Sequence, residues 1–172
     1  GVQTCALPIC VGPVTIDGAM TGEGALTGTL AQPRIDLTAD FDKVAAGPLT
    51  LLNTHMILSF RKGADASDGR ITLAAGSNYG PATASGNFFL GGPAIRLTDV
   101  DLNAGGVVAQ GAIALSNNVP SSADLTFSAR PGAFITSGSA EGRVRLAEGA
   151  GNDTAILDVT ARNARQIGRA HV

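Results

Sequence analysis

The sequence predicts an all-β protein built as an antiparallel meander of strands. In residues 24–40, which read GALTGTLAQPRIDLTAD, apolar and polar residues alternate on both sides of a break at residues 31–33. Alternation with a period of two is typical of a strand with one buried face. The composition agrees, because 23 of the 172 residues are Gly, aromatic residues make up 4% and there is no Trp. No segment shows the period of about 3.6 residues that marks an amphipathic helix.

Turn residues divide the first half of the chain into further alternating runs. A short strand over residues 14–17 precedes a turn at 22–24, and the alternating pair follows. Pro33 cannot donate a ladder hydrogen bond, so it marks a turn or the start of a strand. Residues 41–47 read as a bent continuation of that strand. Further strands are predicted over residues 48–53, 55–61, 70–75 and 82–90.

The second half alternates in the same way and contains one change of parity. Ile95 and Leu97 share one parity, whereas the next apolar residues, Val100 and Leu102, have the other. A shift by one residue near positions 98–99 indicates a β-bulge or kink. Later strands are predicted over residues 107–115, 123–129, 138–146 and 154–161. The total of roughly eleven strands of about 5–9 residues, separated by turn signals, is typical of an all-β meander.

Both ends of the chain resemble translated sequencing adapter. Residues 1–9 read GVQTCALPI, one frame of a short-read adapter, and residues 167–172 read IGRAHV, one frame of its reverse complement. The leftover bases fit the junction residues Cys10 and Gln166. We therefore expect residues 1–10 and 166–172 to be artefact, and residues 11–165 to be a β-repeat segment of a longer protein.

Excluding the two ends changes which functions the composition indicates. Cys5 and Cys10 both fall in the adapter, so neither a disulfide nor thiol chemistry is expected. Without Arg169, the 12 basic residues become 11 against 14 acidic ones, a net charge of −3. A mildly acidic balance argues against nucleic acid as a partner. No apolar run approaches the ~18 residues that a membrane-spanning helix needs.

No combination of polar residues carries an enzyme signature. His55 stands alone beside a strand, with no second base or metal ligand near it in the sequence. Asp99 and Asp101 would share a strand face only without a bulge, and a solvated face explains them better than paired acid–base catalysis. Asp65 and Asp68 form one short acidic turn, which is weak support for calcium. The sequence therefore predicts no catalytic residue, no metal site and no cofactor.

The informative feature is a stripe of apolar residues that recur on one side of the strands. Two sheets packed face to face would bury this stripe in a sandwich. Alternatively, a single long sheet curls into a gutter and the stripe lines it for acyl chains. The stripe consists of Leu26, Leu30, Ile35, Leu37, Leu49, Leu51, Met56, Leu58, Phe60, Ile71, Leu73, Ile95, Leu97, Ile113, Leu115, Leu125, Phe127, Val144, Leu146, Leu157 and Val159.

The repeating pattern resembles a known family. Residues 24–60, GALTGTLAQPRIDLTADFDKVAAGPLTLLNTHMILSF, are similar to the Gly-x-Leu-x-Gly-x-Leu and Pro-x-Ile/Leu units of the TamB family of AsmA-like proteins. Residues 79–90, YGPATASGNFFL, and residues 95–146 continue in the same style, so that the resemblance covers most of residues 11–165. It implies an elongated, twisted antiparallel sheet curled into a groove, the β-taco.

The resemblance also implies a function. Members of this family are anchored in the inner membrane, span the periplasm and partner an outer-membrane barrel of the Omp85 class, which is TamA-like. They are implicated in phospholipid transport to the outer membrane and in protein assembly there. This chain would then be an internal segment, its anchor and barrel contacts lying outside it, and the stripe would contact phospholipid acyl chains. The family supplies no catalytic residue.

A second function remains open from the sequence. A β-solenoid passenger segment of an adhesin or autotransporter would also show short alternating strands and frequent glycine. A solenoid closes several short sheets around a filled core, with side chains stacked rung on rung. The two alternatives therefore differ in whether the apolar stripe is buried or open.

Overall fold

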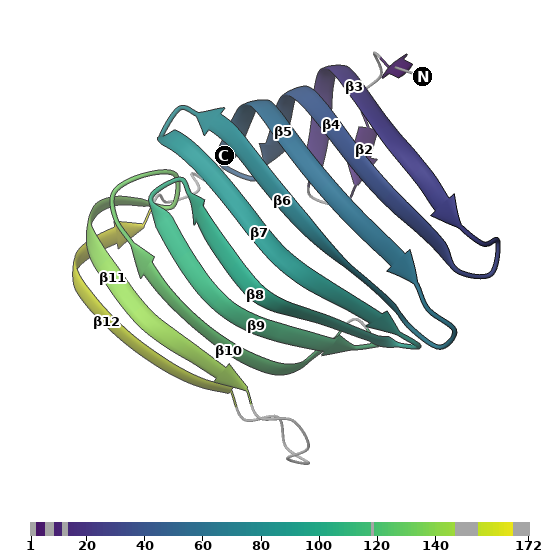
Figure 1. The fold of residues 1–172 in the computed structure, drawn as a ribbon. Helices are drawn as coiled ribbons and strands as arrows, with labels where there is room; N and C mark the ends of the chain where they lie inside the picture. The colour runs from purple at the N-terminus through teal and green to yellow at the C-terminus, as the bar shows by residue number, and fades with distance from the viewer. Residues whose placement is uncertain (1–2, 6–8, 12–13, 118, 147–154, 167–172) are drawn as a thin grey trace.

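A computed structural model of the chain describes residues 3–5, 9–11, 14–117, 119–146 and 155–166. Within these residues twelve strands form one continuous sheet, in which neighbouring strands lie side by side (Figure 1). The strands are β1 (Gln3–Cys5), β2 (Ile9–Val11), β3 (Val14–Gly28), β4 (Pro33–Ala46), β5 (Leu49–Lys62), β6 (Ser67–Ser77), β7 (Gly80–Gly91), β8 (Ala94–Ala104), β9 (Val107–Ser116), β10 (Val119–Ala129), β11 (Ile135–Leu146) and β12 (Ala155–Gln166).

The order of strands in the sheet follows their order in the chain. From β3 to β12 each strand pairs antiparallel with the next, while β1 and β2 both pair with the outer edge of β3. The described residues contain no helix, and thus none that could cross a membrane. The predicted all-β antiparallel meander is confirmed. Within the described part of the chain it is a single sheet, so the face-to-face sandwich does not form.

The strands are longer than the sequence indicates. Strands β3 to β12 contain between 10 and 15 residues. The turn predicted at residues 22–24 does not form, because Gly22 and Gly24 stay in the ladder with β4. Gly18 does not end the strand either. Its φ of 91° coincides with a register shift between Asp17 and Met20, so β3 continues through a bulge.

Bulges bend the long strands. The predicted change of parity is confirmed: Asp99 has a φ of 50°, and the register of β8 against β9 shifts between Leu97 and Val100. Asn53 of β5, also with a φ of 50°, lies at another register shift. An extra residue in one strand increases the local twist and bends that strand.

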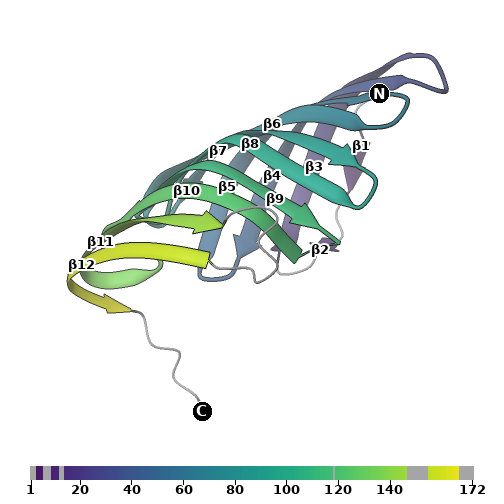
Figure 2. The ribbon, with the colours of Figure 1, turned by 90° about the horizontal axis from the view of Figure 1, so that it is seen from below.

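The sheet is curled, and the curl distinguishes two faces. Figure 2 shows the long strands from below as they arch around one side of the sheet. Phe41 of β4, Ala82 of β7 and Ala104 of β8 belong to one buried cluster, although other strands lie between β4 and β7. Such a cluster forms only if the sheet bends toward the side that carries these residues. We call this side the inner face and the opposite side the outer face.

One end of the inner face is closed by its own side chains. Leu49 and Leu51, at the start of β5, are buried, and Leu49 lies close to Gly105 in the turn that joins β8 to β9. Ala133 lies beside the same glycine and is only 1% exposed. Burial of apolar surface stabilises such a contact by roughly 25 cal/mol per Å². We call this cluster the closed end; its buried members are Ala39, Phe41, Val44, Leu49, Leu51, Ala82, Ala104 and Ala133.

Residues 130–134, between β10 and β11, form a strap across the closed end. The backbone N–H of Ala133 donates to the carbonyl oxygen of Gly105 at 2.8 Å, and that of Arg130 donates to Gly106 at 2.8 Å. A Cβ atom at Gly132 would overlap the carbonyl oxygen of Gly105, so only glycine permits this close approach. The strap therefore fastens the turn between β8 and β9 and covers the closed end.

The two ends that resemble adapter lie at the edges of the sheet. Gln3–Cys5 and Ile9–Val11 pair through their backbones with β3, and Gln166 pairs with Ile135. Residues 1–2, 6–8 and 167–172 of these ends lie outside the described residues. The edge strand of a sheet is a template for any extended segment, so this pairing fits an artefact as well as a native strand. The adapter origin of both ends stays a prediction.

Candidate functional site

The inner face is built from rows of side chains that run across the sheet. Residues paired directly in an antiparallel ladder lie on the same face, with Cβ atoms about 4.5–5.5 Å apart. In one such row Leu37 pairs with Leu58 and Leu58 with Ile71. The row goes on through the pairs Ile71–Gly86, Val100–Gly111, Gly111–Leu125, Leu125–Val144 and Val144–Leu157. A line of aliphatic residues thus extends from β4 to β12.

The structure brings the predicted stripe together on the inner face, with one exception. Leu30 lies in the turn of residues 29–32 between β3 and β4, where its side chain is fully exposed. It has the parity of Leu26, but β3 ends at Gly28 and parity has no meaning beyond that point. The residues placed on the inner face are Leu26, Ile35, Leu37, Leu49, Leu51, Met56, Leu58, Phe60, Ile71, Leu73, Ile95, Leu97, Ile113, Leu115, Leu125, Phe127, Val144, Leu146, Leu157 and Val159.

The predicted stripe leaves out several residues of the inner face. Phe88 and Leu90 of β7 pair with stripe residues of β8, and Val100 and Leu102 continue the face beyond the bulge at Asp99. The sequence holds a signal for all four. Phe88 and Leu90 share one parity within their strand, and restarting the alternation after the bulge identifies Val100 and Leu102.

Side-chain size changes along the strands of the inner face. In the later strands the positions toward the closed end are alanine, as in the ladder pairs Ala75–Ala82 and Ala129–Ala140, whereas β4 and β5 place larger side chains there. Toward the other ends of the strands, which we call the open margin, the rows carry leucine, isoleucine and phenylalanine. Small side chains let the sheet approach itself, as in a tapering barrel. The inner face is therefore buried at the closed end and more exposed at the open margin.

A hollow of about 240 Å³ lies on the inner face where β6, β7 and β8 meet. Gly86 of β7 lines it, and the flanking strands contribute Ile71 and Val100. Aliphatic and aromatic side chains dominate the lining, which also contains Leu73, Ala84, Phe88, Leu97 and Leu102. Leu73 and Leu102 also pack against the closed end. The hollow therefore begins where the closed end stops.

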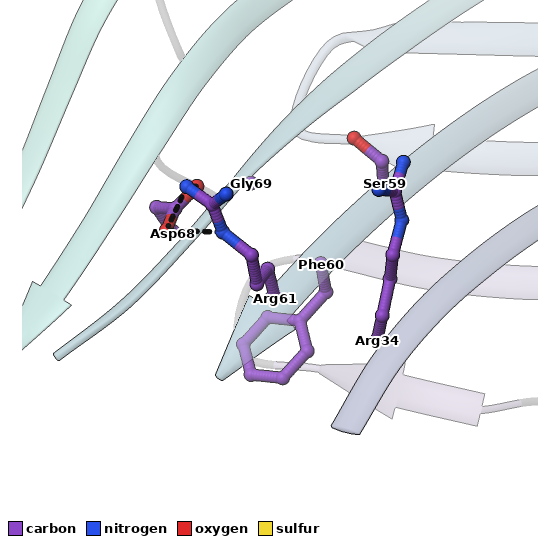
Figure 3. A pocket seen from close by; sticks show the side chains of 6 residues that line it. All are labelled: Arg34, Ser59, Phe60, Arg61, Asp68 and Gly69. Carbon is purple, nitrogen blue, oxygen red and sulfur yellow. Dashed lines mark hydrogen bonds and ion pairs between the residues drawn. The ribbon is translucent and has the colours of Figure 1, made fainter. Parts of the chain in front are cut away.

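A second hollow, of about 220 Å³, lies at the open margin and is polar (Figure 3). Arg34 and Arg61 are directly paired across β4 and β5, and Figure 3 shows the ring of Phe60 pointing away from both guanidinium groups. Arg61 donates from Nη2 to both carboxylate oxygens of Asp68 at 3.1 Å, and Arg34 donates from Nε to Asp36 at 3.2 Å. Because carboxylates already neutralise the two cations, this hollow is not a free anion site. Ser59 and Gly69 complete its lining.

The outer face carries ion pairs between neighbouring strands, and single apolar side chains such as Ile57 and Phe89 are exposed among them. Arg143 of β11 donates to the two carboxylate oxygens of Asp124 of β10 at 2.7 and 2.6 Å. These hydrogen bonds lower the pKa of the Asp124 carboxyl below its ordinary value, and they raise the pKa of Arg143. Both side chains are exposed, and such pairs contribute little to stability. Further pairs are Lys43–Asp17, Arg61–Asp68 and Arg145–Asp158.

The polar residues considered as catalytic or metal-binding lie in ordinary surface contacts. His55 Nδ1 is 2.7 Å from Asp40 Oδ1 on the outer face, and Asn87 Nδ2 donates to Asp99 at 2.8 Å. Asp101 and Asp65 are exposed. Among the residues that the structure describes, no group of three or more His, Cys, Asp or Glu side chains is placed to hold a metal ion.

No protein-family model, no curated protein and no solved structure matches this chain. The candidate site is accordingly the inner face itself, an apolar surface on a single curled sheet.

Proposed function

We propose that this chain is a segment of a periplasmic lipid conduit of the TamB type, whose inner face contacts the acyl chains of phospholipids on their way to the outer membrane. The observation that carries the proposal is the continuous apolar inner face, which nothing among the described residues covers beyond the closed end. Large exposed apolar surfaces on soluble proteins mark sites that bind a partner, a ligand or a membrane.

The division of the two faces supports the same role. Ion pairs and polar side chains separate the apolar residues of the outer face, which can therefore remain in water. The apolar rows run across the strands from β4 to β12, along the direction in which the sheet grows. An acyl chain moving across the sheet would meet leucine, isoleucine or valine on most strands. The proposal assigns no catalytic residue and no cofactor.

The wider role follows the family resemblance. In this proposal the parent protein is anchored to the inner membrane through a segment outside this sequence. It partners an Omp85-class outer-membrane barrel through other parts and assists outer-membrane protein assembly. The β-solenoid passenger loses its structural basis, because the described strands form one antiparallel sheet and do not stack as rungs of several sheets.

Crosslinking at adjacent residues that face opposite ways tests the proposal. Leu58 and Ile57 are neighbours in β5, and Leu58 lies on the inner face while Ile57, half exposed, lies on the outer face. Leu125 and Thr126 form a second such pair in β10. A photoreactive residue at each position, in the full-length protein in cells, should capture phospholipid at Leu58 and Leu125 only. Equal capture at all four positions, or none at the inner pair, would contradict the conduit.

A further inference from the structure

The hollow above Gly86 lies where one strand contributes no side chain to the inner face. Over Gly69, another such position, the ring of Phe88 fills the gap, whereas no atom lies within 3.5 Å of a Cβ placed at Gly86. Gly86 pairs with Ile71 on one side and lies beside Val100 on the other. Strands β6 and β8 thus place aliphatic side chains on both sides of the hollow, while β7 contributes only backbone at this point. The result is a depression of about 240 Å³ between the side chains of β6 and β8.

The hollow offers no polar side chain to a ligand. Ser85, Asn87 and Asp101 border it, but alternation places their side chains on the outer face. Asn87 accepts a hydrogen bond from Arg70 and donates one to Asp99 there. The backbones of β6, β7 and β8 pair with strands on both sides except at the bulge, where Gly86 has no partner residue in β8. Sugars, nucleotides and peptides would therefore leave their polar groups unpaired, which disfavours binding.

The size of the hollow suits part of one hydrocarbon chain. A space of about 240 Å³ holds several methylene groups, each about as large as a water molecule. The volume lies below the roughly 300–1,000 Å³ of sites that enclose a whole small molecule.

The surroundings also orient the occupant. Leu73 and Leu102 line the hollow and pack against the closed end, where Ala82 is 1% exposed. A chain cannot extend past this buried cluster. Phe88 and Leu97 border the side toward the open margin, where the inner face is less buried. The polar end of an occupant therefore has to leave on the open side.

We infer that the hollow above Gly86 is a discrete binding site for one unbranched hydrocarbon chain, whose methyl end points to the closed end and whose polar group stays at the open margin. This inference rests on the proposed function and narrows it. Acyl chains would pause at a fixed place on β6, β7 and β8 and would not contact all rows equally.

Filling the hollow without adding charge tests this inference. A Cβ atom at Gly86 would meet the carbonyl oxygen of Thr98 and a methyl group of Val100 at 3.6 Å, which is ordinary contact. Gly86→Ala is therefore the matched control that keeps most of the space, whereas Gly86→Leu occupies it. Ala84→Leu fills the same space from the next inner-face position. It replaces Gly86→Leu in the experiment if the circular-dichroism spectrum shows that Gly86→Leu disturbs the fold.

The probe is hexadecanoic acid with a diazirine near its methyl end, photolysed on the full chain and mapped by mass spectrometry. Adducts should concentrate on the peptides that contain Leu73 and Leu102, and Gly86→Leu should reduce them by at least about tenfold while Gly86→Ala leaves them. Adducts spread evenly over β4 to β12 and insensitive to Gly86→Leu and Ala84→Leu would overturn the discrete site and leave the conduit standing. No adducts anywhere on the inner face would overturn both.

Discussion

Phe60 of β5 and Phe88 of β7 stack with their ring centroids 6.4 Å apart and their planes inclined by 17°. Strand β6 runs between them, and the residue that it contributes to this row is Gly69, which pairs with both phenylalanines. The rings meet across the intervening strand because Gly69 has no side chain. Aromatic pairs contribute about 0.5–1.5 kcal/mol beyond the apolar area that they bury.

Gly69→Ala should destabilise the sheet more than an alanine elsewhere in the same strand. A Cβ atom at Gly69 would overlap the carbonyl oxygen of Ser59 and the ring of Phe88, so the backbone has to shift. Overpacking of this kind costs typically about 1–3 kcal/mol. Gly76→Ala is the control, because its nearest atom, the carbonyl oxygen of Leu52, is 3.7 Å away. Urea unfolding measures both, and equal stability of the two variants would contradict the predicted overlap.

Arginine on the inner face should be tolerated at the open rows and not at the closed end. Leu58 and Leu125 are half-buried, and the long stem of an arginine there can carry its charge to water. We expect Leu58→Arg and Leu125→Arg to lower the unfolding free energy by no more than about 1–2 kcal/mol. Leu51→Arg buries an unpaired charge and should cost about 3–5 kcal/mol. Protease resistance reports the difference, and unfolding by all three variants would indicate a closed core along the whole face.

Thr54→Val should stabilise the protein. Thr54 is 0% exposed, and its hydroxyl oxygen has no hydrogen-bond partner among the described residues. Replacing a buried hydroxyl that lacks a partner with a methyl group removes a penalty of about 1–3 kcal/mol. Thr54→Ala, which deletes the hydroxyl but also a buried methyl, should gain less or lose stability. A lower urea midpoint for the valine variant would show that the hydroxyl is bonded after all.

The pair of Asp124 and Arg143 should make a small, pH-dependent contribution to stability. Hydrogen bonding to Arg143 lowers the pKa of Asp124 in the folded protein, so the pair stabilises the fold above the ordinary carboxyl pKa. That contribution disappears as the pH falls through the lowered pKa. The melting temperature of Asp124→Asn should therefore lie below that of the wild type near about pH 7 and converge with it near about pH 2. A constant difference over this range would mean that the loss has another cause.

Deleting residues 1–10 and 166–172 should leave the melting transition unchanged within error. These segments are predicted to be adapter, so their side chains did not evolve with the rest of the chain. The ladders of Gln3–Cys5 and Ile9–Val11 with β3 are short and lie at an exposed edge. Differential scanning calorimetry of the shortened chain checks this, and a loss of several degrees would make the ends part of the fold.

Local patterns in the sequence explain most of the sheet and fail where distant segments meet. Alternation places Leu58, Ile71 and Leu125 on one face, and the change of parity locates the bulge at Asp99, because both depend on neighbours along one strand. The closed end depends on Leu49 meeting Gly105, more than fifty residues away. No pattern within a strand encodes that contact. The predicted position of Leu30 is wrong for a third reason, because the alternating parity continues in the sequence after the strand has ended.

The matching order of strands in chain and sheet bears on how the protein folds. Each ladder from β3 to β12 joins segments that follow one another in the sequence, so the loops to be closed are short. Local contacts of this kind favour fast folding for a β protein, because little loop-closure entropy is lost before pairing begins. We expect the hairpins to form one after another along the chain. The strap should dock onto the turn between β8 and β9 only after β10 has paired with β9.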